Sequence, residues 1–90
     1  MLPVNKVPSV GASRIVRRKI MVGVRPVYLS LEVDFWTGFK EIARLEGLTL
    51  AQLLATIMEE HRSSTVSSAV RVFVLEHFRA LARKTMSIIG

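Results

Sequence analysis

The pattern of apolar and polar residues predicts one short strand followed by three helices. Residues 27–31, Val-Tyr-Leu-Ser-Leu, alternate between apolar and polar side chains, as half-buried strands do. Apolar residues then recur at helical spacing in residues 33–46, in residues 50–61, and from residue 67 or 68 to about 84. The predicted fold class is therefore mainly α-helical with one short β-strand.

The predicted strand has two faces of different character. Three apolar side chains share the face that is expected to enter a core: Val27, Leu29 and Leu31. The opposite face carries Pro26, Tyr28 and Ser30, and the last two can form hydrogen bonds. No strand of similar quality follows, so the most economical partner is the same strand of a second copy. The sequence thus predicts a homodimer with an intermolecular, two-stranded antiparallel ribbon.

Local signals set the boundaries of the helices. Gly47 is the left-handed residue that is expected to end the first helix. Thr49 and Gln52 have the spacing of a capping box, so the second helix is expected to begin at Leu50. Gly38 lies within the first helix, where glycine costs about 1 kcal/mol relative to alanine. Close approach of a neighbouring backbone would explain this glycine.

Apolar residues are abundant for a chain of this length. Half of the 90 residues are hydrophobic, whereas a domain of this size buries only about two-thirds of the surface that its unfolded chain exposes. The last helix also carries a wider apolar stripe than one contact needs. Both features favour an obligate oligomer, a homodimer or a higher assembly. The residues expected in the dimer core are Val27, Leu29, Leu31, Trp36, Phe39, Leu53, Ile57 and Phe73.

The positive charge is concentrated at one end of the chain. The formal net charge is +6, and residues 1–31 contain six basic residues and no acidic ones. A basic arm beside a neutral helical body is the electrostatic footprint of nucleic-acid binding. A solvated basic tail or an organelle transit peptide are the alternatives for this segment. The basic side chains expected to contact DNA phosphates are Arg14, Arg17, Arg18 and Lys19.

Three segments follow from these observations. Residues 1–16 are expected to form a flexible basic arm, residues 17–84 the folded domain, and residues 85–90 a short apolar tail.

Enzymatic and metal-dependent functions find little support. The chain has no cysteine, which excludes disulfides, zinc fingers and thiol catalysis and suits a reducing cytoplasm. His61 and His77 lie on different predicted helices, and no set of Asp, His and Ser has catalytic spacing. The uncharged run at residues 47–58 is too short to span a bilayer, which takes about 20 residues. We expect no enzyme, no cofactor, no metal site and no membrane span.

The order of strand, helix and helix has a specific physical use. Two strands paired antiparallel fit the major groove of B-DNA, where outward side chains meet the edges of the bases. The candidates for base contact are Tyr28 and Ser30, together with Arg25 at the strand end. The start of the second helix, at Thr49 and Leu50, offers free N–H groups and a positive dipole end to a phosphate.

Several runs resemble the ribbon-helix-helix domain of bacterial and phage repressors. They are Leu-Ser-Leu-Glu at 29–32, Phe-Trp at 35–36, Ile-Ala at 42–43 and Glu-Gly-Leu-Thr-Leu at 46–50. The run Ser-Ala-Val-Arg-Val-Phe-Val-Leu-Glu-His-Phe-Arg at 68–79 is similar to the end of a narrower bacterial family of such domains. The resemblance covers about residues 17–79.

This resemblance implies a dimeric, DNA-binding fold with an added C-terminal helix, in a cytoplasmic bacterial transcription regulator. By position it places Pro26, Tyr28 and Ser30 in the groove, and Thr49 and Leu50 at a phosphate clamp. One departure concerns the strand itself. Where the family commonly has a small polar run such as His-Arg-Thr-Ser, this chain has Arg-Pro-Val-Tyr at 25–28, and proline cannot read a base by hydrogen bonding.

A rival interpretation keeps the fold and changes the partner. The wide apolar stripe of the last helix and the apolar tail would hold a partner protein, as in an antitoxin or an adaptor. Proline in the reading strand favours this alternative, and the two functions can coexist in one protein.

Overall fold

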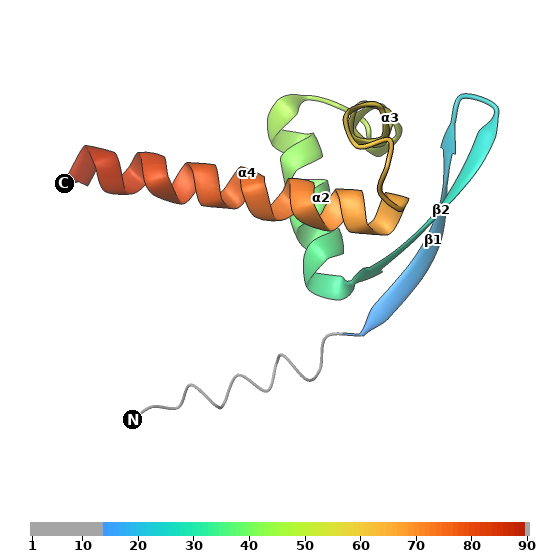
Figure 1. Cartoon of the computed structure of the whole chain (residues 1–90), viewed down its shortest axis with the longest axis horizontal. Coiled ribbons are helices and arrows are strands. Elements are labelled where there is room, and N and C mark those ends of the chain that lie inside the picture. The colour runs from blue at the N-terminus through green and yellow to red at the C-terminus, as the bar shows by residue number, and fades with distance from the viewer. Residues whose placement is uncertain (1–13, 90) are drawn as a thin grey trace.

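A computed structural model describes residues 14–89 as a β-hairpin followed by three helices (Figure 1). The elements in chain order are β1 (Ile15–Val22), β2 (Arg25–Glu32), α2 (Val33–Glu46), α3 (Leu50–Glu60) and α4 (Val66–Ile89). The prediction of an antiparallel ribbon, two helices and an added C-terminal helix is confirmed. Residues 1–13, most of the predicted arm, and Gly90 of the predicted tail lie outside the described residues.

Both strands of the ribbon belong to the same chain. β1 and β2 pair antiparallel along their whole lengths, and Val22 lies opposite Arg25 at the turn. Gly23 and Val24 make this turn, in which Gly23 takes a φ of +67° that glycine adopts without strain. The prediction of a single strand at residues 27–31 is therefore corrected, because β2 covers Arg25–Glu32 and has a partner strand, β1, in the same chain. An intermolecular ribbon in a homodimer stays a prediction.

A charged residue on the core-facing side of β1 explains why the sequence did not predict this strand. Val16, Ile20 and Val22 are half-buried and alternate with exposed residues, as strand residues do. Arg18 lies on the same side of the strand, and its guanidinium carbon is 5.6 Å from the ring centroid of Trp36. Because this cation interrupts the apolar alternation, the pattern alone indicates a basic arm.

The position of Pro26 within β2 makes it compatible with the ladder. The N–H of Ser30 donates to Oγ of Ser67 at 3.0 Å, so it points away from β1. Sites with outward-pointing backbone groups recur at every second residue of an antiparallel strand. Tyr28 and Pro26 therefore occupy sites of the same kind. Proline has no N–H to offer, and at this site the ladder needs none.

The helix boundaries largely follow the predictions. α2 covers Val33–Glu46 as expected and ends at Gly47, whose φ of +69° is left-handed. α3 begins at Leu50, as predicted, and ends at Glu60. α4 starts at Val66, one or two residues before the expected position, and continues past the predicted end at residue 84 to Ile89.

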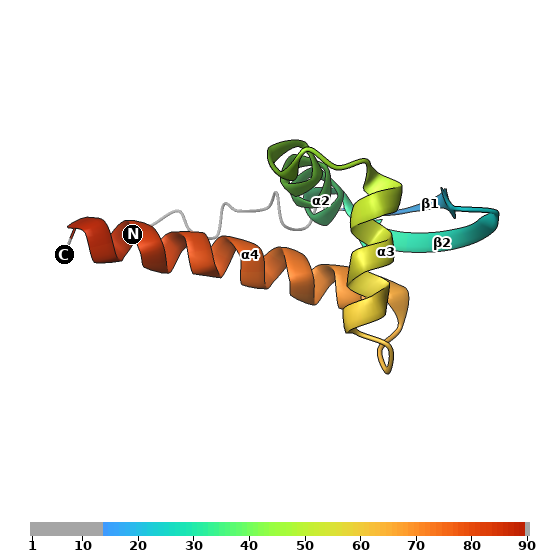
Figure 2. The same cartoon turned by 90° about the horizontal axis from the view of Figure 1, so that it is seen from above.

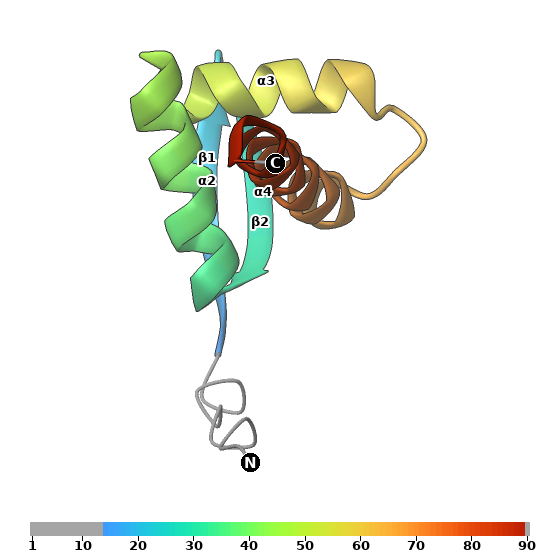
Figure 3. The same ribbon diagram turned by 90° about the vertical axis from the view of Figure 1, so that its left-hand side faces the viewer.

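The core forms between one face of the ribbon and the three helices. Figure 3 shows α2, α3 and the start of α4 gathered on the same side of the two strands. The buried apolar side chains are Val27, Leu29, Leu31, Trp36, Phe39, Ile42, Ala43, Leu53, Leu54, Ile57, Ala69, Val70 and Val74. Phe73, which the sequence placed in a dimer core, is only partly buried against this cluster. The other seven residues assigned to a dimer core are already buried within one chain.

α4 has a packed half and a projecting half. Among residues 66–86, the last buried side chain is Val74, and the remainder of the helix extends well beyond α2 (Figure 2). α2 and α4 meet at Gly38, where an added Cβ would lie 2.9 Å from Cγ1 of Val74 and 3.4 Å from Cε2 of Phe78. Gly38 thus accommodates side chains of α4, and not a backbone as the sequence suggested.

Candidate nucleic-acid interface

One face of the ribbon points away from the helices, and we call it the outer face. Residues opposite each other in the ladder share a face, so the register assigns Arg17 with Ser30 and Lys19 with Tyr28 to this side. Arg17, Lys19 and Tyr28 are exposed, and Tyr28 is 53% accessible. The full outer face comprises Ile15, Arg17, Lys19, Met21, Pro26, Tyr28, Ser30 and Glu32.

Arg17 and Tyr28 form a pair across the two strands. The guanidinium carbon of Arg17 lies 4.7 Å from the centroid of the Tyr28 ring, within the range of a cation–π contact. The contact orders two long side chains that are otherwise free to move on the surface. The outer face therefore presents a preorganised cation beside an aromatic ring that carries a hydroxyl group.

The four basic residues expected at phosphates do not lie together. Arg17 and Lys19 are on the outer face, whereas Arg18 is on the helix side over Trp36. Arg14 is exposed, and its carbonyl oxygen accepts the Val33 N–H at 2.8 Å. The structure thus brings Arg17 and Lys19 together and places Arg18 on the other side of the ribbon.

Arg25 is also separated from the other two candidates for base contact. It pairs with Val22 at the turn, and parity places its side chain on the helix side of the ribbon. There it lines a cavity of about 200 Å³ together with Met58, His61 and Arg62. Tyr28 and Ser30 remain on the outer face, so the structure groups two of the three predicted base-contact residues.

The start of α3 has the predicted capping box. Oγ1 of Thr49 accepts the Gln52 N–H at 3.0 Å, and Oε1 of Gln52 accepts the Thr49 N–H at 2.9 Å. The first N–H groups of any helix have no acceptor within the helix, and Thr49 is exposed. This end of α3 is chemically suited to a phosphate, and its assignment with Leu50 to a phosphate clamp remains a prediction.

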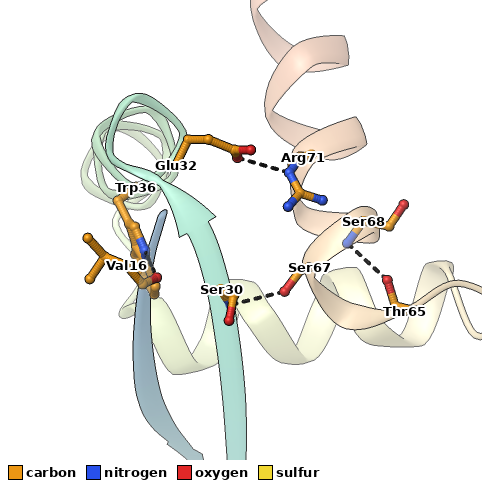
Figure 4. Close-up of polar contacts among 8 residues, drawn as sticks. All are labelled: Val16, Ser30, Glu32, Trp36, Thr65, Ser67, Ser68 and Arg71. Carbon is orange, nitrogen blue, oxygen red and sulfur yellow. Dashed lines mark hydrogen bonds and ion pairs between the residues drawn. The ribbon is translucent and has the colours of Figure 1, made fainter. Parts of the chain in front are cut away.

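Two contacts join α4 to β2, and the sequence predicted neither (Figure 4). Oγ of Ser67 accepts the Ser30 N–H at 3.0 Å, and Nε of Arg71 donates to Oε1 of Glu32 at 3.0 Å. Donation by Arg71 is the main cause that lowers the pKa of the Glu32 carboxyl group. Serine, glutamate and arginine commonly form hydrogen bonds, but the partners here are 37 and 39 residues apart in the sequence. No local pattern in the sequence therefore indicates these two contacts.

Other kinds of site find no support within residues 14–89. No group of three or more His, Asp or Glu side chains in this range is arranged to hold a metal ion. No helix in the same range is long and apolar enough to cross a membrane. His77 packs between aromatic rings, with centroids 6.4 Å from Phe73 and 5.1 Å from Phe78.

Comparison with known proteins adds one finding. A family model described as a ribbon-helix-helix domain matches residues 15–78, which include both strands, α2, α3 and the packed half of α4. Comparisons with curated proteins and with solved structures gave no match.

Proposed function

Because the chain belongs to the ribbon-helix-helix domain family, whose members are generally DNA-binding transcription regulators or antitoxins, we propose that it binds double-stranded DNA with sequence selectivity. In this proposal it is a small dimeric transcription regulator of the bacterial cytoplasm. The observation that carries the proposal is the outer face, where basic and hydrogen-bonding side chains gather on a ribbon of the size that a major groove admits.

The shape of the ribbon supports groove binding. The major groove of B-DNA is about 12 Å wide and admits a two-stranded ribbon. Helices cover only the inner face of this hairpin, so its outer face is free to enter a groove (Figure 1). Tyr28 and Ser30 would then meet base edges, because both carry hydroxyl groups that donate and accept hydrogen bonds.

The charges of β1 support contact with the backbone. Arg17 and Lys19 flank the groove-facing residues of β2 across the ladder. Glu32, the acidic residue that ends the ribbon, is held by Arg71 of α4. The ribbon therefore offers positive charge with its one carboxylate neutralised, as binding to a polyanion requires. Arg14 and the start of α3 at Thr49 would add phosphate contacts at its margins.

The salt dependence of DNA binding tests this proposal. Replacing Arg17 and Lys19 with alanine should weaken binding to all sequences and reduce the slope of log K against log salt by about 1.8 for each chain bound. The matched control is Arg83→Ala with Lys84→Ala, which removes the same charge from the projecting half of α4. Equal losses in both variants would show that net charge alone matters. A wild-type protein that ignores DNA fragments at low salt would overturn the proposal.

A second candidate function rests on the exposed side of α4. Val72, Leu75 and Leu81 are each about half exposed in the described chain, which suits an interaction module that holds another protein. If wild-type protein did not bind DNA, while Leu75→Glu with Leu81→Glu changed its mass in solution, the α4 surface would be the functional one.

A further inference from the structure

A cavity of about 200 Å³ lies where the start of β2 meets the end of α3. Its lining residues come from β2, from α3 and the loop that follows it, and from α4: Arg25, Met58, His61, Arg62, Ser64, Val66 and Ala69. We propose that this cavity binds a small monocarboxylate with a short hydrocarbon chain. The proposal stands apart from DNA binding, because the cavity lies on the helix side of the ribbon and not on the outer face.

A second cavity adjoins the first. Its volume is about 460 Å³, and it shares the lining residues Arg25, Met58 and Arg62 with its neighbour. The shared residues make the two cavities parts of one depression, so that a hydrocarbon chain can extend from one part into the other. The larger part falls within the range of about 300–1,000 Å³ that is typical of small-molecule sites.

Two arginines line the cavity from different parts of the fold. Arg25 begins β2, whereas Arg62 follows α3. The ion pairs found within residues 14–89 do not include Arg25. Arg62 donates through Nη2 to Oε2 of Glu59 at 2.7 Å, and this leaves other N–H groups of its guanidinium for a ligand. The planar guanidinium group matches the two oxygens of a carboxylate.

The charge around the cavity favours a monoanion over a dianion such as phosphate. With histidine counted as neutral, Arg25 and Arg62 carry two positive charges, and Glu59, which lines the adjoining cavity, carries one negative charge. The carbonyl end of α3 adds partial negative charge at the same place. A single carboxylate balances the net positive charge, whereas a dianion would exceed it and would be repelled by Glu59.

One part of the lining is apolar. Ala69 is buried, and Met58 and Val66 are half-buried against the core cluster. A hydrocarbon chain that lies on these three side chains leaves water, which favours binding. The lining therefore has the composition of a small-molecule site, with apolar surface and a few convergent polar groups. The carboxylate would meet the arginines while its chain covers the apolar part.

NMR titration of the full, ¹⁵N-labelled chain with acetate, butyrate and hexanoate tests the proposal. If the hydrocarbon chain lies on the apolar part of the lining, the affinity should rise about fourfold for each CH₂ group added. The amide signals that shift most should be those of residues 58–69. An affinity that did not change with chain length would overturn the proposal. So would shifts that are largest within residues 72–86, on the exposed side of α4.

Inorganic phosphate is the probe that distinguishes the chemical class of the anion. It offers oxygens to the same guanidinium groups but has no apolar part and carries more charge. At pH 7 it should bind more weakly than hexanoate. Tighter binding of phosphate than of any of the three carboxylates would overturn the assignment to a monocarboxylate.

Paired substitutions test the role of the two arginines. Arg25→Gln with Arg62→Gln should lower the affinity for hexanoate about tenfold, since each exposed ion pair contributes up to about fivefold. The matched control is Arg44→Gln with Arg83→Gln, which removes the same charge from α2 and α4 and should stay within about twofold of the wild type. All four side chains are exposed, so both variants should fold, and their NMR spectra report this directly. Equal losses in the two variants would mean general attraction of an anion to a basic protein, and would overturn the proposal.

Discussion

Arg71 of α4 donates through Nε to Oε1 of Glu32, the last residue of β2, at 3.0 Å. This donation lowers the pKa of the Glu32 carboxyl group. A carboxyl group whose pKa is lower in the folded chain stabilises the fold above its unfolded pKa and loses this contribution as the pH falls through the folded pKa. We therefore expect the wild-type protein to melt at a higher temperature than Glu32→Gln near pH 7, and the difference to vanish as the pH falls through the lowered pKa of the Glu32 carboxyl group.

The measurement is a set of thermal unfolding curves across that pH range. Glu60→Gln is the matched control, because Glu60 is exposed and takes no part in the ion pairs found within residues 14–89. Its melting temperature should follow that of the wild-type protein at each pH. A difference between Glu32→Gln and the wild type that persisted unchanged at low pH would show that the ion pair does not join α4 to β2.

At the crossing of α2 and α4, we expect Gly38→Ala to lower the stability of the fold, although helix propensity alone would raise it. Gly38→Ala should gain about 1 kcal/mol from propensity, but its Cβ would lie 2.9 Å from Cγ1 of Val74. Overpacking of a core typically costs about 1–3 kcal/mol. We expect a net loss of up to about 2 kcal/mol in the free energy of unfolding by chemical denaturation.

A double-mutant cycle isolates the contact at this crossing. Val74→Ala removes the side chain that the new methyl group would meet, so the double variant should be more stable than the sum of the single effects predicts. Simple additivity would mean that Gly38 and Val74 do not press on each other, and that α4 crosses α2 at a greater distance.

The sequence predicted elements whose signals are local, and it was less informative where a contact joins distant residues. The capping box at Thr49 and the left-handed Gly47 depend on neighbours in sequence, and the structure has both where the sequence predicts them. β1 was not predicted, because Arg18 occupies a site on the helix side of the strand, where its guanidinium group lies over the ring of Trp36, a residue of another element. No periodicity in residues 15–22 reveals that contact.

The same limit applies to the candidate interface. Alternation placed Tyr28 and Ser30 on the exposed side of their strand, where the structure has them. The division of the basic residues into Arg17 and Lys19 on one side and Arg18 on the other follows only from the register of β1. Once that strand is known, the register is a matter of counting from the turn at Gly23.

The capping box makes a prediction for stability that is independent of DNA. Thr49→Ala removes the hydroxyl that accepts the Gln52 N–H, and loss of such a cap costs about 1 kcal/mol. Thr56→Ala on the same helix is the control, since the hydroxyl of Thr56 only donates to the Gln52 carbonyl within the helix, and its effect should stay within about 0.5 kcal/mol. Equal effects of the two substitutions on the free energy of unfolding would mean that the cap contributes nothing.

Tyr28 lies on the outer face opposite Lys19 and beneath the guanidinium group of Arg17. If its hydroxyl group reads a base edge, Tyr28→Phe should keep the ring contact with Arg17 and the affinity for random DNA. Discrimination between the preferred site and random DNA should then fall by about 1–3 kcal/mol, the value of one good base contact. Tyr28→Ala should lose this discrimination and also free Arg17, which lowers affinity for both DNAs. Competition titrations with the two duplexes at one salt concentration provide the comparison. Unchanged discrimination in Tyr28→Phe would limit Tyr28 to a role in orienting Arg17.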